Sequence, residues 1–159
     1  MLKKRWLALA VCLGLLAISC IYVRPPRLSV EERQKVAQRL QATTVPSAKY
    51  SSAAILLLLN EPQDHDLVAE QLDRETDPAL LASLIIALAH WGQQESAEQV
   101  VKHLTDTRPV TCLLIDGKEG TTTVSEIAAK AMHALKRPRP RRNLPRPFPF
   151  AVKTDLIVK

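Results

Sequence analysis

The segment DPALLASLIIALAHWG, residues 77–92, decides what kind of fold this chain can adopt. Eleven consecutive residues within it, 79–89, form a run in which Ser83 is the only polar side chain. Coiled as a helix, such a run is apolar on every side, so the helix has to be buried all round. It is too short to cross a membrane, which takes about 20 apolar residues. Other parts of the chain must therefore cover it.

The composition favours an all-α protein. The chain has 159 residues, of which 47% are apolar, but aromatic residues make up only 4% and there are four glycines. Leu and Ala dominate, and Glu, Gln and Lys are frequent; all five are good helix formers. The length suits a single domain with appendages.

A second copy of the same pattern supplies the cover. Residues 52–78 and 83–109 each contain an almost wholly apolar helix, a polar turn and then an amphipathic helix. The two copies begin at Ser52 and Ser83, which are 31 residues apart. A period of this length is typical of stacked helix pairs, in which neighbouring pairs bury what one pair leaves exposed.

Four features stand out in the second copy: Asp77-Pro78, the run 84–89, the turn Gly92-Gln93 and the helix 97–104. With these features the repeated unit resembles a HEAT repeat of the short bacterial kind, which is also found in phycobilisome-lyase-type proteins. The earlier copy is less regular, with Asn60 where the glycine is usual. The resemblance covers residues 50–136 and implies an all-α fold, a short right-handed α-solenoid of HEAT-like helix pairs. It says almost nothing about activity, because one fold hosts many functions.

Elements at both ends of the repeats complete the predicted domain, residues 29–136. Ser29 followed by Glu32 is the capping-box pattern of a helix start, and the narrow apolar stripe that follows is typical of a first, capping helix. Residues 110–124 interrupt the period between the second and third copies. Their β-branched run, glycine-containing turn and threonines predict a β-hairpin insertion. A third apolar helix follows, starting near Ser125 and Glu126.

The N-terminal residues 1–23 are predicted to be a signal peptide or a membrane anchor. A basic cluster precedes an uncharged stretch, residues 6–23. LAISC, ending at Cys20, resembles a bacterial lipoprotein lipobox, which implies diacylation of that cysteine. Ordinary cleavage after Ser19 and retention as an uncleaved anchor are the alternatives. All three place the rest of the chain outside the cytoplasm, and cleavage after Ser19 would release it as a soluble protein. We expect a membrane-anchored protein on the extracytoplasmic side of the cell envelope, with a proline-stiffened linker at 24–28.

The C-terminal residues 137–159 are predicted to be a Pro/Arg-rich tail. The net charge of the chain is +6, and much of it lies in six basic residues: Lys136, Arg137, Arg139, Arg141, Arg142 and Arg146. Prolines between 138 and 149 exclude a helix there and favour polyproline II. Such a tail is simply solvated, contacts an anionic membrane surface, or docks in a groove of another protein. Residues 151–159 form a short strand or stay disordered.

The sequence contains no convincing catalytic or metal-binding motif. Its four histidines lack metal-ligand spacing, and the acidic residues of Asp64-His65-Asp66 suit a helix N-terminus. Cys112, the one cysteine outside the N-terminal segment, is predicted to be buried. We therefore expect no enzyme activity, no cofactor and no metal.

We expect instead a protein-binding scaffold or accessory protein that uses the surface of its helical repeats, with the basic tail as a secondary contact. The candidate binding residues are Trp91, Arg137, Arg139, Arg141, Arg142 and Arg146. Trp91 lies at a turn and is either a packing residue or an exposed anchor. The alternatives are a lyase-type or chromophore-handling role, implied by the resemblance, and a subunit that completes a larger repeat stack. A subunit of this last kind would form oligomers. Nucleic acid is not expected, because the chain is exported and lacks a base-stacking aromatic platform.

Overall fold

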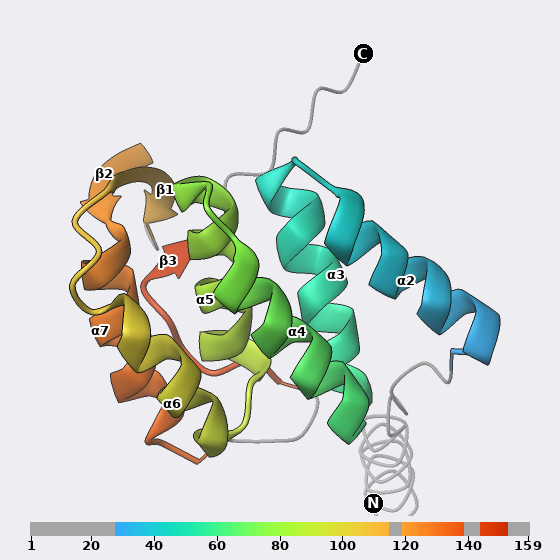
Figure 1. Ribbon diagram of the computed structural model, residues 1–159. Helices are drawn as coiled ribbons and strands as arrows, with labels where there is room; N and C mark the ends of the chain where they lie inside the picture. Colours follow the sequence, from blue (N-terminus) through green and yellow to red (C-terminus); the bar gives the residue numbers. More distant parts are fainter. Residues whose placement is uncertain (1–27, 115–118, 139–143, 153–159) are drawn as a thin grey trace, which may run out of the picture.

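The computed structural model describes residues 28–114, 119–138 and 144–152. These residues are mostly helical and also form a small antiparallel sheet, as predicted (Figure 1). The helices are α2 (Val30–Ala42), α3 (Pro46–Leu59), α4 (Pro62–Arg74), α5 (Pro78–Trp91), α6 (Ala97–Val100) and α7 (Val124–Leu135). Short 3-10 turns, Gln94–Ser96 and Val101–His103, flank α6.

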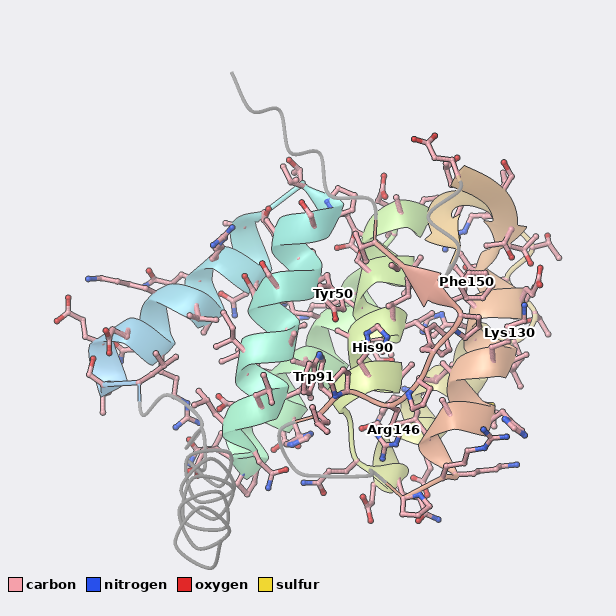
Figure 2. All side chains as sticks on the ribbon, turned by 180° about the vertical axis from the view of Figure 1, so that it is seen from behind. Tyr50, His90, Trp91, Lys130, Arg146 and Phe150 are labelled. Atoms are coloured by element: carbon pink, nitrogen blue, oxygen red, sulfur yellow. The ribbon has the colours of Figure 1, made fainter. Side chains whose placement is uncertain are left out.

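The helices lie in two rows. Helices α3, α5 and α7 contact one another in that order and form the inner row. Helices α2, α4 and α6 lie against them and form the outer row, which faces the viewer in Figure 1. Figure 2 shows the molecule from behind, looking onto the inner row. Successive helices therefore alternate between the rows along the chain.

Helix boundaries follow from local chemistry. Proline stands at the start of α3, α4 and α5, where its fixed φ suits a helix and its missing N–H costs nothing. Asp77 caps α5, because its Oδ1 accepts hydrogen bonds from the amides of Ala79 at 2.8 Å and Leu80 at 3.0 Å. The predicted capping box of α2 is confirmed: Ser29 and Glu32 each bond the other's backbone N–H.

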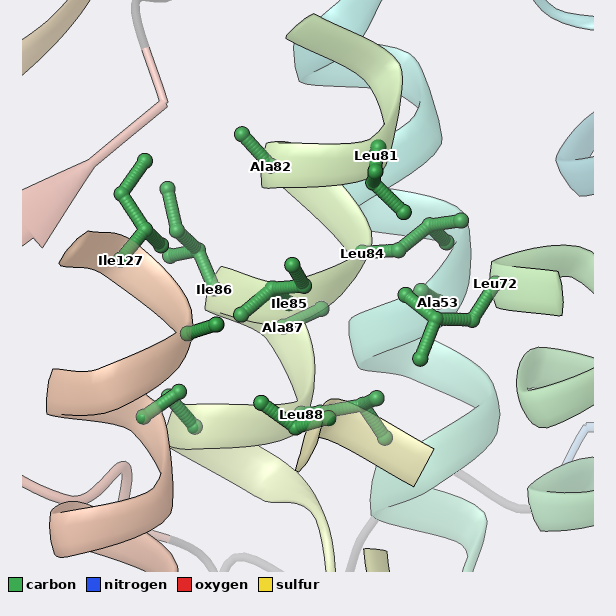
Figure 3. Close-up of a cluster of buried hydrophobic side chains, with 14 of the residues drawn as sticks. Ala53, Leu72, Leu81, Ala82, Leu84, Ile85, Ile86, Ala87, Leu88 and Ile127 are labelled. Atoms are coloured by element: carbon green, nitrogen blue, oxygen red, sulfur yellow. The ribbon is translucent and has the colours of Figure 1, made fainter. Parts of the chain in front are cut away.

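Helix α5 is the centre of the core (Figure 3). Every residue from 80 to 89 is buried, which confirms that its neighbours cover it on all sides. Helix α3 packs on one flank and α7 on the other. Ser83, the only polar residue of the apolar run, donates its hydroxyl hydrogen to the carbonyl of Ala79 at 2.8 Å. The polar group is therefore satisfied inside the helix, and the surface of α5 remains apolar.

The predicted hairpin is confirmed, with slightly different bounds. Strand β1 (Pro109–Leu114) pairs antiparallel with β2 (Glu119–Thr123), and Val110 lies opposite Thr122. Thr123 ends the hairpin and caps α7, because its Oγ1 accepts a hydrogen bond from the amide of Glu126 at 3.2 Å. Helix α7 therefore begins at Val124, slightly earlier than predicted.

A third strand comes from the C-terminal segment. Strand β3 (Phe150–Ala151) pairs antiparallel with the free side of β1, giving the order β2-β1-β3. It belongs to residues 144–152, which we call the strap. The strap runs along the inner row (Figure 2). Three of its side chains are buried, with 6%, 7% and 3% of their surface exposed: Arg146, Phe148 and Phe150.

This burial corrects our expectation for the tail. We expected residues 137–159 to be solvated or to contact a membrane or another protein, yet the strap belongs to the core of its own chain. The physical reason is that its two phenylalanines bury apolar surface and its arginine finds backbone carbonyls, so the strap is held despite its prolines.

Several predictions fall outside the described residues. These are the signal or anchor at 1–23 with Cys20, most of the linker at 24–28, and Arg139, Arg141 and Arg142. In the part of the chain that the structure describes, none of the helices has the length and apolarity needed to span a bilayer.

Candidate functional site

Arg146 fastens the strap to the ends of two inner-row helices. Its Nη1 donates to the carbonyl of Gly92 at 2.7 Å, just beyond α5, and its Nε donates to the carbonyl of Arg137 at 3.0 Å, just beyond α7. Its own amide donates to the carbonyl of His90 at 3.1 Å. Carbonyls at helix C-termini lack intrahelical partners and carry partial negative charge, so a cation is favoured there. Burial lowers the pKa of Arg146, but a guanidinium stays protonated.

A chain of aromatic rings continues from this anchor across the inner row. Tyr50 on α3, His90 on α5, and Phe148 and Phe150 on the strap meet edge to face, with centroid separations of 5.9, 5.7 and 5.7 Å in that order. Such pairs are favourable beyond the surface that they bury. At the end of the chain, Nζ of Lys130 on α7 lies 4.5 Å from the centroid of Phe150 (Figure 2). The strap thus links α3, α5 and α7.

Tyr50 also takes part in a polar network with the end of α5. The indole N–H of Trp91 can only donate, so the Tyr50 oxygen accepts it at 3.3 Å. The Tyr50 hydroxyl hydrogen is then directed to Nδ1 of His90, 3.0 Å away. Burial raises the pKa of Tyr50 and lowers the pKa of His90. Both changes favour the neutral forms, which this hydrogen-bonding pattern requires.

The candidate binding residues have different environments. Trp91 is half-buried and packs against the core, as a turn-packing residue would. Arg146 is buried and engaged by backbone carbonyls, so its guanidinium is not part of the exposed surface. Arg137 is exposed at the end of α7. The structure therefore brings Trp91 and Arg146 together at the end of α5, and it leaves Arg137 facing solvent.

The turn after α5 needs a glycine at position 92 because there is no room for a side chain there. Its φ of −61° suits any residue, so conformational freedom is not the reason. A Cβ at this position would lie 2.6 Å from the carbonyl oxygen of Leu88 and 3.0 Å from Oγ of Ser96. The corresponding turn after α3 is built differently, because Asn60 adopts the left-handed conformation with φ of 59°. The two copies of the repeat therefore close their first helices by different means.

A groove lies between α7 and the strap and has a volume of about 370 Å³. The α7 wall is formed by Ala129, Lys130, His133, Ala134 and Arg137, and the strap wall by Pro147, Phe148 and Pro149. Every ionisable side chain that lines it is basic. Sequence reasoning missed Lys130 and His133. Their i, i+3 spacing places both on one face of α7, which ends just before Arg137, and this spacing was the available signal.

Buried ion pairs fix the first helices of the stack. Lys49 on α3 is 2% exposed; its Nζ lies 3.0 Å from the Glu75 carboxylate and donates to the carbonyl of Leu40 at 2.9 Å. Asp64 on α4 accepts a hydrogen bond from Nε of Arg33 at 2.8 Å. These contacts join α2, α3 and α4, and because Lys49 and Asp64 are buried, removing the partner of either would be costly.

The predicted burial of Cys112 is confirmed. This thiol is 2% exposed, and burial raises its pKa. In the described ranges, no group of three or more His, Cys, Asp or Glu side chains comes together in a way that could hold a metal ion. Asp64, from the acidic turn at 64–66, is engaged by Arg33.

No protein-family model, curated protein or solved structure matches this chain. The likenesses to a HEAT repeat and to a lipoprotein signal therefore remain predictions from the sequence. Function has to be inferred from the geometry of the inner row, the strap and the groove.

Proposed function

We propose that this protein is a non-catalytic, protein-binding scaffold or accessory protein of the bacterial cell envelope. In this proposal the helix pairs are a short right-handed HEAT-like solenoid held at the membrane by the N-terminal segment. The alternation of helices between an inner and an outer row supports the solenoid. The basic cluster, the uncharged stretch and Cys20 support the envelope location.

One observation carries the binding role: the strap is locked against the inner row and forms one wall of an open groove. Arg146 bonds carbonyls beyond both α5 and α7, and the aromatic chain reaches α3. Such a surface is preformed, so a partner that docks on it loses little free energy in ordering it. A groove of about 370 Å³ lies in the range of sites that bind small ligands or a few side chains of a partner.

The lyase-type alternative is less well supported. Attachment of a chromophore needs an exposed nucleophile, and a reactive thiol needs a lowered pKa. Cys112 is buried and its pKa is raised. A thiol reagent should therefore leave Cys112 unmodified in the folded protein, and rapid modification would favour the lyase-type role.

Site-specific photo-crosslinking in cells tests the binding role. A photoreactive residue is placed at Ala129 beside the groove, at Glu70 on the outer row and at Lys35 on α2, all of which are exposed. The proposal predicts a discrete protein adduct from at least one position. Lipid adducts alone, or no adduct at any position, would contradict it.

Point changes are preferable to truncation in this experiment. A chain ending at Leu135 would lose Phe148, Phe150 and the anchor Arg146, which are part of the core. Loss of a partner in that variant would therefore report unfolding as readily as a lost contact.

The lipid anchor has its own test. Cells that are fed a labelled fatty acid should incorporate the label into the wild-type protein but not into Cys20→Ala. Equal labelling of both would exclude lipidation at Cys20. The cleaved signal and the uncleaved anchor would then remain as the alternatives.

A further inference from the structure

We propose that the groove between α7 and the strap binds an extended, acidic segment of a partner protein that also carries aromatic or proline side chains. This inference rests on the proposed scaffold function and names the chemistry of the partner. It rests on the charge of the groove, its apolar wall and its shape.

The charge of the groove selects for an anion. Lys130, His133 and Arg137 line its α7 side, and all three are exposed. The lining has no carboxylate. Glu126 lies outside the lining and pairs with Lys130 at 2.9 Å, so it balances part of one charge only. A concave surface lined by one sign of charge attracts ligands of the opposite sign.

The basic character extends along the chain beyond the groove. Lys136 is exposed next to Arg137, just beyond the end of α7. A partner with more than one carboxylate therefore suits this end of α7 better than a single anionic group.

The opposite wall of the groove selects for flat, apolar side chains. It consists of Pro147, Phe148 and Pro149 from the strap, while the alanines of α7 leave space opposite them. Pro147 and Pro149 are exposed, and their rings present faces on which an aromatic side chain can stack, while Phe148 is itself buried. The ligand therefore needs apolar groups between its carboxylates.

The shape of the groove favours a protein segment over a membrane surface. A volume of about 370 Å³ holds a few side chains of an extended chain. Binding to a bilayer relies on apolar side chains that enter the lipid, whereas Phe148 is buried against the core and packs edge to face with His90. An acidic peptide is therefore the ligand that fits, and binding to lipid becomes the competing outcome of the test.

An unbiased peptide selection tests the proposal. The full-length chain, kept in a non-ionic detergent, is used to select binders from a random nine-residue peptide library, and the affinity of the enriched peptides is then measured. We expect peptides that contain several Asp or Glu residues together with Phe, Tyr, Trp or Pro. Their affinity should fall as salt is added, because the contacts are exposed and screened.

Variants at Ala129 give a matched pair for charge. This alanine lines the groove and is exposed on α7, so a longer side chain does not disturb the core. Ala129→Glu should bind the selected peptides about fivefold more weakly than Ala129→Lys, the scale of one exposed charge pair. Equal affinities for these two variants would overturn the proposal.

A second set of variants removes the basic side chains. The double variant Lys130→Gln with Arg137→Gln should bind about tenfold more weakly. Lys35→Gln and Arg74→Gln serve as controls, because both residues form exposed i,i+4 ion pairs on outer-row helices, as Lys130 does on α7. Loss of affinity in the controls as well would contradict a groove site.

Three results would overturn the inference outright. These are enrichment of basic or uncharged peptides, no enrichment, and binding to anionic phosphatidylglycerol vesicles that depends on Ala129 while acidic peptides fail to bind. Failure here is distinct from failure of the scaffold function. Crosslinks to protein from Glu70 or Lys35 would preserve the scaffold even if the groove binds no peptide.

Discussion

Helix α5 and the strap are both buried, but they achieve this by different means. In α5 every residue from 80 to 89 is buried, and nearly all of them are apolar. In the strap, burial alternates: Arg146, Phe148 and Phe150 are buried, while the three prolines between and before them are exposed. The helix is inserted among its neighbours on all sides, whereas the strap lies on their surface with one face inward.

The difference follows from backbone geometry. A helix with neighbours all round needs apolar side chains at every angle. An extended segment directs alternate side chains to opposite sides, so every second residue is enough. Proline lacks an N–H and suits the outward positions, while the inward residue Arg146 keeps its amide for the carbonyl of His90. A segment rich in proline and arginine can therefore belong to a core.

The largest loss of stability is expected from a substitution in the buried helix α5. Leu84 on α5 is completely buried. Leu84→Ala should lower the free energy of unfolding by about 4 kcal/mol, because it removes buried apolar surface and leaves a cavity. Urea unfolding followed by circular dichroism measures this, and a loss below about 1 kcal/mol would mean that α5 is not enclosed.

The strap should show a somewhat smaller loss at its buried positions. Phe148→Ala should cost about 3 kcal/mol, because Phe148 packs against His90 and Phe150. Leu144→Ala is the control, since Leu144 is exposed on the same segment, and it should change stability by less than about 0.5 kcal/mol. Similar small effects for both would indicate a strap that does not contribute to the fold.

Arg146 should contribute to the stability of the fold through its hydrogen bonds. Arg146→Met keeps much of the apolar stem but loses the donors to the carbonyls of Gly92 and Arg137, so we expect a loss of about 2 kcal/mol. Arg146→Lys should recover only part of this, because an ammonium lacks the fork of donors. If Arg146→Met were as stable as the wild type, the hydrogen bonds of Arg146 would not anchor the strap.

Removal of the N-terminal cap of α5 should cause a smaller loss of stability. Asp77→Ala removes the side chain that accepts from the amides of Ala79 and Leu80. The expected loss is about 1 kcal/mol, and Asp77→Asn should retain most of the stability because Asn also caps helices. If Asn and Ala were equally damaging, the cap would not be the reason for aspartate here.

The smallest effect should be a pH dependence of unfolding. Burial lowers the pKa of His90 and of His103 below 6.5, so the unfolded state takes up their protons more readily than the folded state. The contribution to stability is complete above pH 6.5 and is lost as the pH falls from there through the folded pKa. His90→Gln should lose less stability than wild type between pH 7.5 and 5.5. An unchanged slope would contradict a neutral His90 under the strap.

The window above pH 5 isolates the histidines. The carboxyl groups whose pKa is lowered by hydrogen bonds, those of Glu32, Asp106 and Glu126, start from values of 4.5 or below. Their contributions are lost only at more acidic pH. His103→Gln, which changes the outer row instead, separates the two histidines.

The sequence alone predicted the elements whose burial follows from local pattern. The apolar run of α5, the capping box at Ser29 and the two strands of the hairpin each have a short-range signal, and the structure contains all three. We predicted a start of α7 near Ser125 and Glu126, whereas in the structure Thr123, the last residue of β2, caps the helix.

The strap and the groove could not be predicted in the same way. Net charge and proline content dominate residues 136–149, and both suggest solvent exposure. The alternation of arginine, phenylalanine and phenylalanine with proline was visible, but its partners are carbonyls and rings far away in the chain. The glycine at the turn after α5 was expected from the repeat pattern, but the reason for it, the close approach of the turn to the Leu88 carbonyl, becomes visible only in the structure.

The most direct test of the central claim is the hydrogen exchange of one amide, that of Arg146, measured by NMR on the full-length chain labelled with ¹⁵N-arginine. This amide donates to the carbonyl of His90 across the strap–α5 contact. If the strap is part of the folded core, the Arg146 amide should exchange only by large-scale opening, at a rate close to those of the most protected amides. Exchange at the rate of an unstructured peptide would show that the strap does not form, and with it the groove would be lost.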